Sequence, residues 1–268
     1  MVSHTPLRRV AGRAGYRFTP LDAVSLVLKR LRRTGRERLL RAFGLPSRAQ
    51  VRANHMEAMY YQSFLSLKGH LGIEIPFYPF GGAANSSLLY LLSRAVSSLP
   101  FTSVCELGSG QSTLLLDALA TERPQMRVES YEQREFWANQ VRSCLMNADR
   151  VQVKRRDLRS ELLRGVSKPF YDLGADVEGK RFDLLVIDGP SGEKRHSRWG
   201  ALKLIEEHLC PDFLIVFDDA ERLGEEDTYI EAVKLLREKG VRFYTETVEA
   251  QKSQFLIASE RMRAACYF

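Results

Sequence analysis

The chain has 268 residues, of which 44% are hydrophobic and 27% charged, a balance typical of soluble globular proteins with one large core. Its longest apolar runs, such as Leu88–Leu92 and Phe213–Phe217, are far too short to cross a bilayer. The four cysteines are widely spaced, which excludes a thiolate metal site or disulfide framework and favours a reducing, cytoplasmic setting.

The formal net charge of +7 is unevenly distributed along the chain. Residues 1–53 contain thirteen Lys and Arg against two acidic residues, a net charge of +11. The remaining residues therefore carry a net charge of −4. We interpret residues 1–53 as a basic helical extension and residues 54–268 as the globular domain.

Residues 21–43 of the extension are predicted to be helical and basic. Apolar residues recur there at helical spacing: Leu21, Val24, Val27, Leu28 and Leu31. Such a helix either packs on the main domain or binds an anionic membrane surface. Nucleic acid is less favoured, because the aromatic residues of single-strand binders are sparse. Residues 1–20 lack the apolar stretch of a secretory signal, but their arginines leave a transit peptide open.

Residues 54–85 begin the main domain with an aromatic-rich segment. The aromatic residues there include Tyr60, Tyr61, Phe64, Phe77, Tyr78 and Phe80. Aromatic side chains often line ligand sites, so the segment is interpreted either as a lid on the acceptor side or as core between helices. Asn85 then provides a helix cap before the apolar run Leu88–Val96.

A glycine turn follows the first predicted strand, Phe101–Cys105. Glu106 ends this strand, and Gly108 and Gly110 come next, before an apolar segment with helical character. Because glycine has no Cβ, such a turn brings the backbone close to a ligand. The free amides at the start of the helix favour polar or anionic ligand atoms.

Strands and helices alternate through the rest of the chain. Further strands are predicted over residues 126–131, 151–153, 182–187, 213–217, 241–247 and 253–259, and helices over 134–145, 198–208 and 229–239. The last two strands are separated by too few residues for a crossover helix and should pair antiparallel. The pattern predicts a doubly wound, seven-stranded α/β sheet.

Acidic residues stand at the carboxyl end of nearly every predicted parallel strand. They are Glu106, Glu132, Asp157, Asp188, Asp218 and Asp219. Doubly wound sheets bind ligands at this edge. Glu132 also stands where a βαβ unit places an acid against ribose hydroxyls.

Residues 85–260 resemble the class I S-adenosylmethionine-dependent methyltransferases, which have five parallel strands and a closing antiparallel pair. The first motif of that family, which holds the methionine end of the cofactor, is matched by Glu106, Gly108, Ser109 and Gly110, with Ser112 in place of the third glycine. The resemblance implies that Glu132 binds the ribose, that Asp157 contacts the adenine, and that Asp188 lines the same pocket. A nicotinamide-binding turn would need glycine at Thr113.

Three of these strand-end acids resemble the metal site of the metal-dependent O-methyltransferases, including sugar-modifying ones. The resemblance implies that Asp188, Asp218 and Asp219 hold Mg²⁺ or another divalent cation and that Asp188 is catalytic. The other interpretation is that Asp218 caps a turn and Asp219 is solvated. His196 is a candidate base in the absence of a metal. The Ile187–Gly192 stretch looks more like polysaccharide-directed than catechol methyltransferases.

The sequence therefore predicts a methyltransferase of EC class 2.1.1 that methylates a hydroxyl of a sugar, glycan or other small-molecule acceptor. One alternative is a metal-free methyltransferase for a small molecule or RNA. Another is a non-catalytic module that binds the cofactor and holds a partner through its basic arm. The protein is expected in the cytoplasm, either free or peripheral to a membrane, and a homo-oligomer remains open.

Overall fold

The computed structural model describes residues 46–79 and 82–268 of the chain. The chain consists of two compact units, one that ends at Val51 and a second, Arg52–Phe268. The basic helix predicted over residues 21–43 lies outside the described residues, as do residues 1–20. Each helix within the described ranges is too short or too polar to span a membrane.

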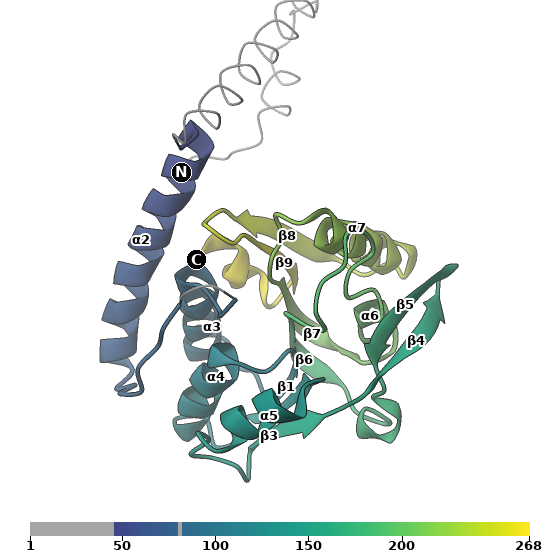
Figure 1. Cartoon of the computed structure of the whole chain (residues 1–268), viewed down its shortest axis with the longest axis horizontal. Coiled ribbons are helices and arrows are strands. Elements are labelled where there is room, and N and C mark those ends of the chain that lie inside the picture. The colour runs from purple at the N-terminus through teal and green to yellow at the C-terminus, as the bar shows by residue number, and fades with distance from the viewer. Residues whose placement is uncertain (1–45, 80–81) are drawn as a thin grey trace, which may run out of the picture. The chain divides into compact units, whose positions relative to one another are not determined.

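The second unit contains a seven-stranded sheet in the order β3-β2-β1-β6-β7-β9-β8. The strands are β1 (Ser103–Leu107), β2 (Arg127–Glu132), β3 (Val151–Arg155), β6 (Phe182–Ile187), β7 (Leu209–Phe217), β8 (Phe243–Val248) and β9 (Gln254–Ser259). The first five run parallel, and β9 lies antiparallel to both β7 and β8. The predicted doubly wound sheet with its closing antiparallel pair is confirmed (Figure 1).

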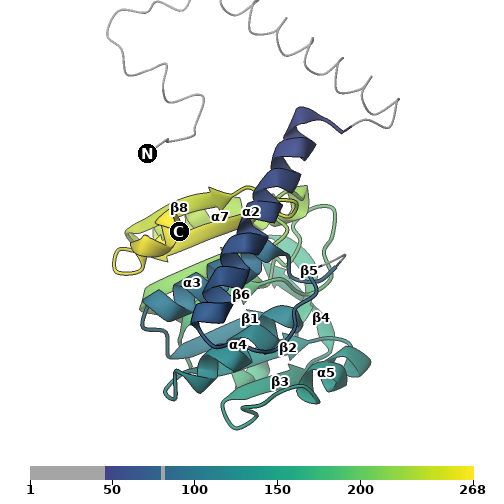
Figure 2. The same cartoon turned by 90° about the vertical axis from the view of Figure 1, so that its left-hand side faces the viewer.

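Helices cover both faces of this sheet (Figures 1 and 2). They are α3 (Ser86–Ser98), α4 (Gln111–Thr121), α5 (Glu135–Arg142), α6 (Ala201–Glu207) and α7 (Leu223–Glu238), with 3₁₀ turns at Gly174–Asp176 and Arg263–Tyr267. Side chains alternate across a strand, so Leu184 and Val186 pack with α3 and α4. Leu185 and Ile187 pack with α6 and α7 on the other face. A strand buried on both faces explains the unbroken apolar run of β6.

Helix α2 (Arg48–His70) is the first helix of the described part of the chain, and two of its aromatic residues, Tyr60 and Phe64, pack in the core. Phe64 is buried and meets Phe77 edge to face, with ring centroids 5.4 Å apart. Tyr60 contacts Tyr90 of α3 at 5.6 Å. The aromatic residues Tyr60, Phe64 and Phe77 therefore belong to the core, in line with one of the two interpretations of residues 54–85. A role of this segment as a lid stays a prediction.

A hairpin that the sequence analysis did not predict follows β3. Its strands are β4 (Leu158–Leu163) and β5 (Val166–Tyr171), which pair antiparallel as a separate two-stranded sheet. Arg164 and Gly165 connect them with φ of 51° and 78°, the left-handed pair that a two-residue hairpin turn requires. The indole N–H of Trp199 donates to the Leu163 carbonyl oxygen at 2.9 Å, which fastens the hairpin to the main body.

Candidate active site

A cavity of about 630 Å³ opens at the carboxyl ends of the parallel strands. The topology explains its place, because the loops that follow β1, β2, β6 and β7 all meet at this edge. Seven of the residues predicted from the sequence line it: Gly108, Ser109, Gly110, Ser112, Glu132, Asp188 and Asp219. Its volume is within the usual range of small-molecule sites.

The glycine turn forms one wall by packing against the loop after β6. Gly108 has φ +92°, and a Cβ there would lie 3.0 Å from backbone atoms of Asp188 and Gly189. A Cβ on Gly189 would in turn overlap the Tyr171 hydroxyl and meet the Gly108 backbone at 2.7 Å. Both positions therefore require glycine, because the two loops approach as closely as their backbones allow.

Glu106 lies beneath the turn and is fully buried. Its Oε2 accepts hydrogen bonds from Thr113 Oγ1 at 2.5 Å and from Ser130 Oγ at 2.6 Å. Burial raises the pKa of Glu106, and the hydroxyls of Ser112, Ser130 and Thr113 oppose that rise. Thr113 Oγ1 also accepts from the Gly110 amide at 2.8 Å. The first-motif acid thus holds the turn in place from behind the cavity wall.

Glu132 forms the adjacent wall at the end of β2. Its side chain is buried, lines the cavity, and accepts the Arg134 amide at 2.7 Å on Oε1. Gln133, the next residue, donates to Ser191 Oγ at 3.0 Å and so links the loops after β2 and β6. Glu132 and the glycine turn therefore face one cavity, as a dinucleotide-type ribose site requires.

Trp137 is a cavity residue that the sequence analysis missed. It lies on α5, is 45% exposed, and donates its indole N–H to the Ser109 carbonyl oxygen at 2.6 Å. A large aromatic residue one turn into the helix after Glu132 was the available signal. Because the register of this helix was predicted only approximately, the direction of the Trp137 side chain could not be predicted.

Four of the predicted site residues do not line the cavity. Glu106 and Asp218 are fully buried, whereas Asp157 and His196 lie away from it. Asp157 has an exposed side chain and pairs with Arg155, with oxygens 2.5 and 2.7 Å from the guanidinium. His196 packs edge-on against Trp199 at 4.7 Å, and its backbone amide donates to Asp227 at 2.9 Å. Neither is among the residues that line the cavity. Their roles in adenine binding and in base catalysis remain predictions.

The three acids of the predicted metal site do come together. Asp188, Asp218 and Asp219 offer carboxylate oxygens that all lie within 4.8 Å of one another. Burial raises the pKa of Asp188, and the charge of Asp218 raises it further. Burial and the charge of Asp219 likewise raise the pKa of Asp218. Such mutual repulsion calls for nearby positive charge.

Arg198 supplies part of that charge from a buried position. Its Nη2 lies 3.2 Å from Asp188 Oδ1 and 2.8 Å from Asp219 Oδ2, and its Nη1 donates to the Ile187 and Asp218 carbonyl oxygens. Arg198 and Asp219 both have left-handed backbones, with φ of 57° and 60°. Such conformations cost of order 1–3 kcal/mol and concentrate at functional sites.

Two more cations complete the cluster. Arg222 Nη1 lies 2.8 Å from Asp219 Oδ2, and its side chain is half-exposed on the cavity wall. Lys252 Nζ lies 3.7 Å from Asp219 Oδ1 and 4.0 Å from Asp218 Oδ2. Arg222 and Lys252 were not predicted, because neither adjoins a motif in the sequence.

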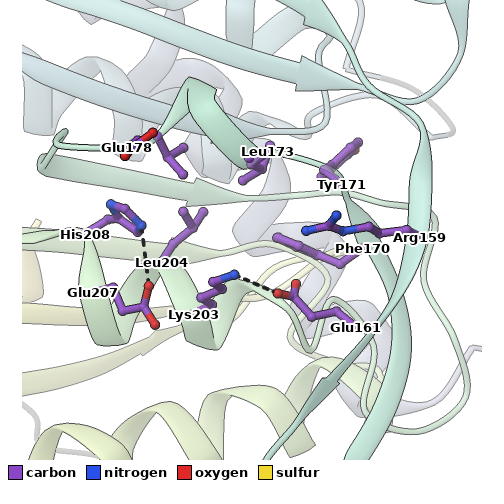
Figure 3. Close-up of a pocket in the computed structure, with 12 residues that line it drawn as sticks. Arg159, Glu161, Phe170, Tyr171, Leu173, Glu178, Lys203, Leu204, Glu207 and His208 are labelled. Atoms are coloured by element: carbon purple, nitrogen blue, oxygen red, sulfur yellow. Dashed lines mark hydrogen bonds and ion pairs between the residues drawn. The ribbon is translucent and has the colours of Figure 1, made fainter.

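A second cavity, of about 250 Å³, lies between the β4–β5 hairpin and α6 (Figure 3). Lys203 and Glu161 form an ion pair of 2.9 Å on its wall, and His208 faces Glu207 at 3.8 Å. Tyr171 lines both cavities. None of the predicted site residues, all of which are described, lines this second cavity, so the candidate site is the larger one.

No family model matches the sequence, and the search of curated proteins found no match. Solved structures are similar to it. SAH-bound methyltransferase PaMTH1 from Podospora anserina is 12% identical, with a TM-score of 0.48 over 74% of this chain and 88% of that one. Cofactor-bound Rv0187 from MTB is 20% identical, with a TM-score of 0.45 over 75% and 89%. An O-methyltransferase from Bacillus cereus in complex with SAH is 16% identical, with a TM-score of 0.39 over 75% and 91%.

Similarity at this level does not fix a substrate or a reaction, because one fold hosts many functions. The fold itself follows from the strand order and directions described above. Five parallel strands, a glycine turn after β1 and a closing antiparallel strand give this chain the class I S-adenosylmethionine-dependent methyltransferase fold.

Proposed function

We propose that the protein transfers a methyl group from S-adenosylmethionine to a hydroxyl oxygen. One observation carries the proposal: a single cavity joins the glycine turn and Glu132 to the acidic residues Asp188 and Asp219. The first pair suits a cofactor with a ribose and a charged amino-acid end, and the second suits chemistry on an acceptor. The same cavity thus offers suitable residues both for binding the methyl donor and for activating the acceptor.

Cofactor binding would use the walls formed by β1 and β2. The amides at the start of α4 suit the carboxylate of the methionine portion, because the first N–H groups of a helix lack partners inside the helix. Glu132 suits the ribose hydroxyls, since a buried carboxylate accepts two hydrogen bonds from a diol. Trp137 offers the face or edge of an aromatic ring to the bound molecule.

Acceptor chemistry would take place near Asp188, Asp218 and Asp219. A neutral hydroxyl is a poor nucleophile, and a divalent cation bound there would lower its pKa. The donor set fits such a cation, because carboxylate oxygens are its preferred ligands. In addition, Asp218 Oδ2 and Asp219 Oδ1 are buried without a hydrogen-bond partner among the described residues. Asp188, at 21% exposure of its side chain, is the member that an acceptor can reach.

A sugar or glycan is the proposed acceptor. The stretch after β6 resembles polysaccharide-directed methyltransferases, and Asp188 and Ser191 of that stretch offer polar groups to the cavity. Arg222, half-exposed on that wall, would also suit the carboxylate of an acidic sugar. These features support a sugar or glycan as the class of acceptor.

Isothermal titration calorimetry with S-adenosylmethionine tests the cofactor assignment. Wild-type protein is expected to bind, and Glu132→Ala to bind at least tenfold more weakly. Glu135→Ala is the matched control, because Glu135 begins α5 with a 59% exposed side chain and does not line the cavity. Absence of binding to folded wild-type protein would refute the proposed function.

Methyl transfer itself is tested with a panel of sugars, oligosaccharides and catechols and with labelled S-adenosylmethionine. The expected result is transfer to a sugar hydroxyl that is lost in Asp188→Asn while cofactor binding persists. Each reaction is repeated with EDTA. Methyl transfer that is unchanged by EDTA would show that the reaction needs no divalent cation, and the acidic residues would then act without one.

A further inference from the structure

The acidic cluster includes a lysine from a distant part of the chain, and its position has a consequence for cation binding. Lys252 lies between β8 and β9, whereas Asp218 and Asp219 follow β7. Its ammonium nitrogen donates to the Ala83 carbonyl oxygen at 2.9 Å. From there it faces one oxygen of each aspartate, at 4.0 and 3.7 Å.

A buried polar network holds the backbone of Lys252 in this place. Its carbonyl oxygen accepts from Asn85 Nδ2 at 3.1 Å, from Gln254 Nε2 at 3.3 Å and from Ser87 Oγ at 3.4 Å. Gln254 in turn donates to Asp218 Oδ1 at 2.8 Å. Gln254 thus contacts both the lysine backbone and the carboxylate. The Lys252 side chain is 15% exposed and is held by its bond to Ala83, so it has a defined direction, unlike a solvated surface residue.

The other oxygens of the aspartate pair are already satisfied. Gln254 occupies Asp218 Oδ1, and Arg198 and Arg222 both lie 2.8 Å from Asp219 Oδ2. The two oxygens that remain, Asp218 Oδ2 and Asp219 Oδ1, are buried and have no hydrogen-bond partner among the described residues. They are also the two oxygens that Lys252 faces, so a single positive charge is shared between them.

We propose that the Lys252 ammonium and a divalent cation compete for one position between Asp218 and Asp219. A cation bound to the two free oxygens would lie close to the lysine nitrogen, and like charges at such short range repel strongly. Lys252 must therefore swing away before the cation binds. The lysine keeps the aspartate pair neutralised while no metal is bound, and it lowers the affinity of the site for metal.

Binding of Mn²⁺ alone, followed by the loss of its free-ion electron paramagnetic resonance signal, tests this competition without cofactor, acceptor or turnover. Lys252→Met is expected to bind Mn²⁺ at least tenfold more tightly than wild type. Lys252→Gln is measured beside it and carries the same expectation, should the methionine variant fold poorly. Because no methyl transfer is involved, failure of the proposed function would leave this result intact.

Three controls separate charge competition from a general effect. Lys252→Arg keeps the positive charge and is expected to bind as weakly as wild type. Lys203→Met removes a lysine that pairs with Glu161 at the other cavity, and is expected to change nothing. Asp218→Asn added to Lys252→Met should abolish the gain. Equal Mn²⁺ affinity in wild type and both neutral variants, including no binding in any of them, would overturn the proposal.

Discussion

The Trp137 indole N–H donates to the Ser109 carbonyl oxygen across 2.6 Å, which ties helix α5 to the glycine turn. Because Trp137 also lines the cavity, its ring would contact the cofactor in the proposed function. Trp137→Ala is expected to raise the dissociation constant for S-adenosylmethionine about tenfold, which corresponds to about 1.4 kcal/mol. Calorimetry measures this constant directly.

The neighbouring residue provides the control for that change. Phe136 is 74% exposed and does not line the cavity, so Phe136→Ala is expected to leave the constant unchanged. Trp137→Phe should fall between wild type and Trp137→Ala, since it retains a ring but loses the hydrogen bond. Equal constants for Trp137→Ala and Phe136→Ala would show that the indole contributes nothing to cofactor binding.

Gly108→Ala is expected to destabilise the protein by about 1–3 kcal/mol. The new Cβ would lie 3.0 Å from backbone atoms of Asp188 and Gly189, at a φ of +92° that other residues rarely adopt. Gly110→Ala is the control, because its φ is 180° and no atom lies within 4 Å of the added Cβ. Urea denaturation gives both free energies of unfolding, and similar losses for the two variants would contradict the close-packing account.

The sequence predicted those parts of the fold that bury apolar side chains. Strand β6 was predicted at Phe182–Ile187, where the structure places it. All six residues are buried, which explains the mostly apolar run that the prediction used. The β4–β5 hairpin was missed, since most of its residues are exposed or half-buried and show no apolar run. Burial against other elements, rather than local propensity, decides such segments.

The candidate site was predictable to a similar degree. Topology alone brings the ends of parallel strands together, so the glycine turn and Asp188, Asp218 and Asp219 could be assigned to one edge. The cations that balance these acids could not be found in this way. Lys252 and Arg198 reach the cluster from loops with long, flexible side chains, and Arg198 and Asp219 have left-handed backbones; neither property has a sequence signature.

Stability is expected to depend on pH through Asp227. Hydrogen bonds from Arg195 lower the pKa of Asp227 to about 2, whereas an unfolded aspartate titrates near a pKa of about 3.9. A depressed pKa stabilises the folded state fully above the unfolded value, and this contribution is lost as the pH falls through the folded one. The gap in unfolding free energy between wild type and Asp227→Asn should therefore be constant above about pH 5 and shrink below about pH 4. Urea titrations at several pH values measure it, and a gap that widens on acidification would contradict this assignment.

Arg198 and Arg195 provide a matched pair for testing the buried charge network. Arg198 is 5% exposed and balances Asp188, Asp219 and, with Nε 3.7 Å from Oε1, Glu225. Removing one partner of a buried ion pair leaves charge without compensation, so Arg198→Met is expected to cost about 3–5 kcal/mol. The Arg195 side chain is 63% exposed, and water takes over much of the stabilisation when such a surface pair is broken.

Arg195→Met should therefore cost far less than Arg198→Met in the same denaturation experiment. The two substitutions delete the same chemical group from one loop, so a difference between them reports burial rather than residue type. If both variants lose little free energy of unfolding, Arg198 is not the main counter-charge of the acids. The aspartates would then have to be protonated or neutralised chiefly by Arg222 and Lys252.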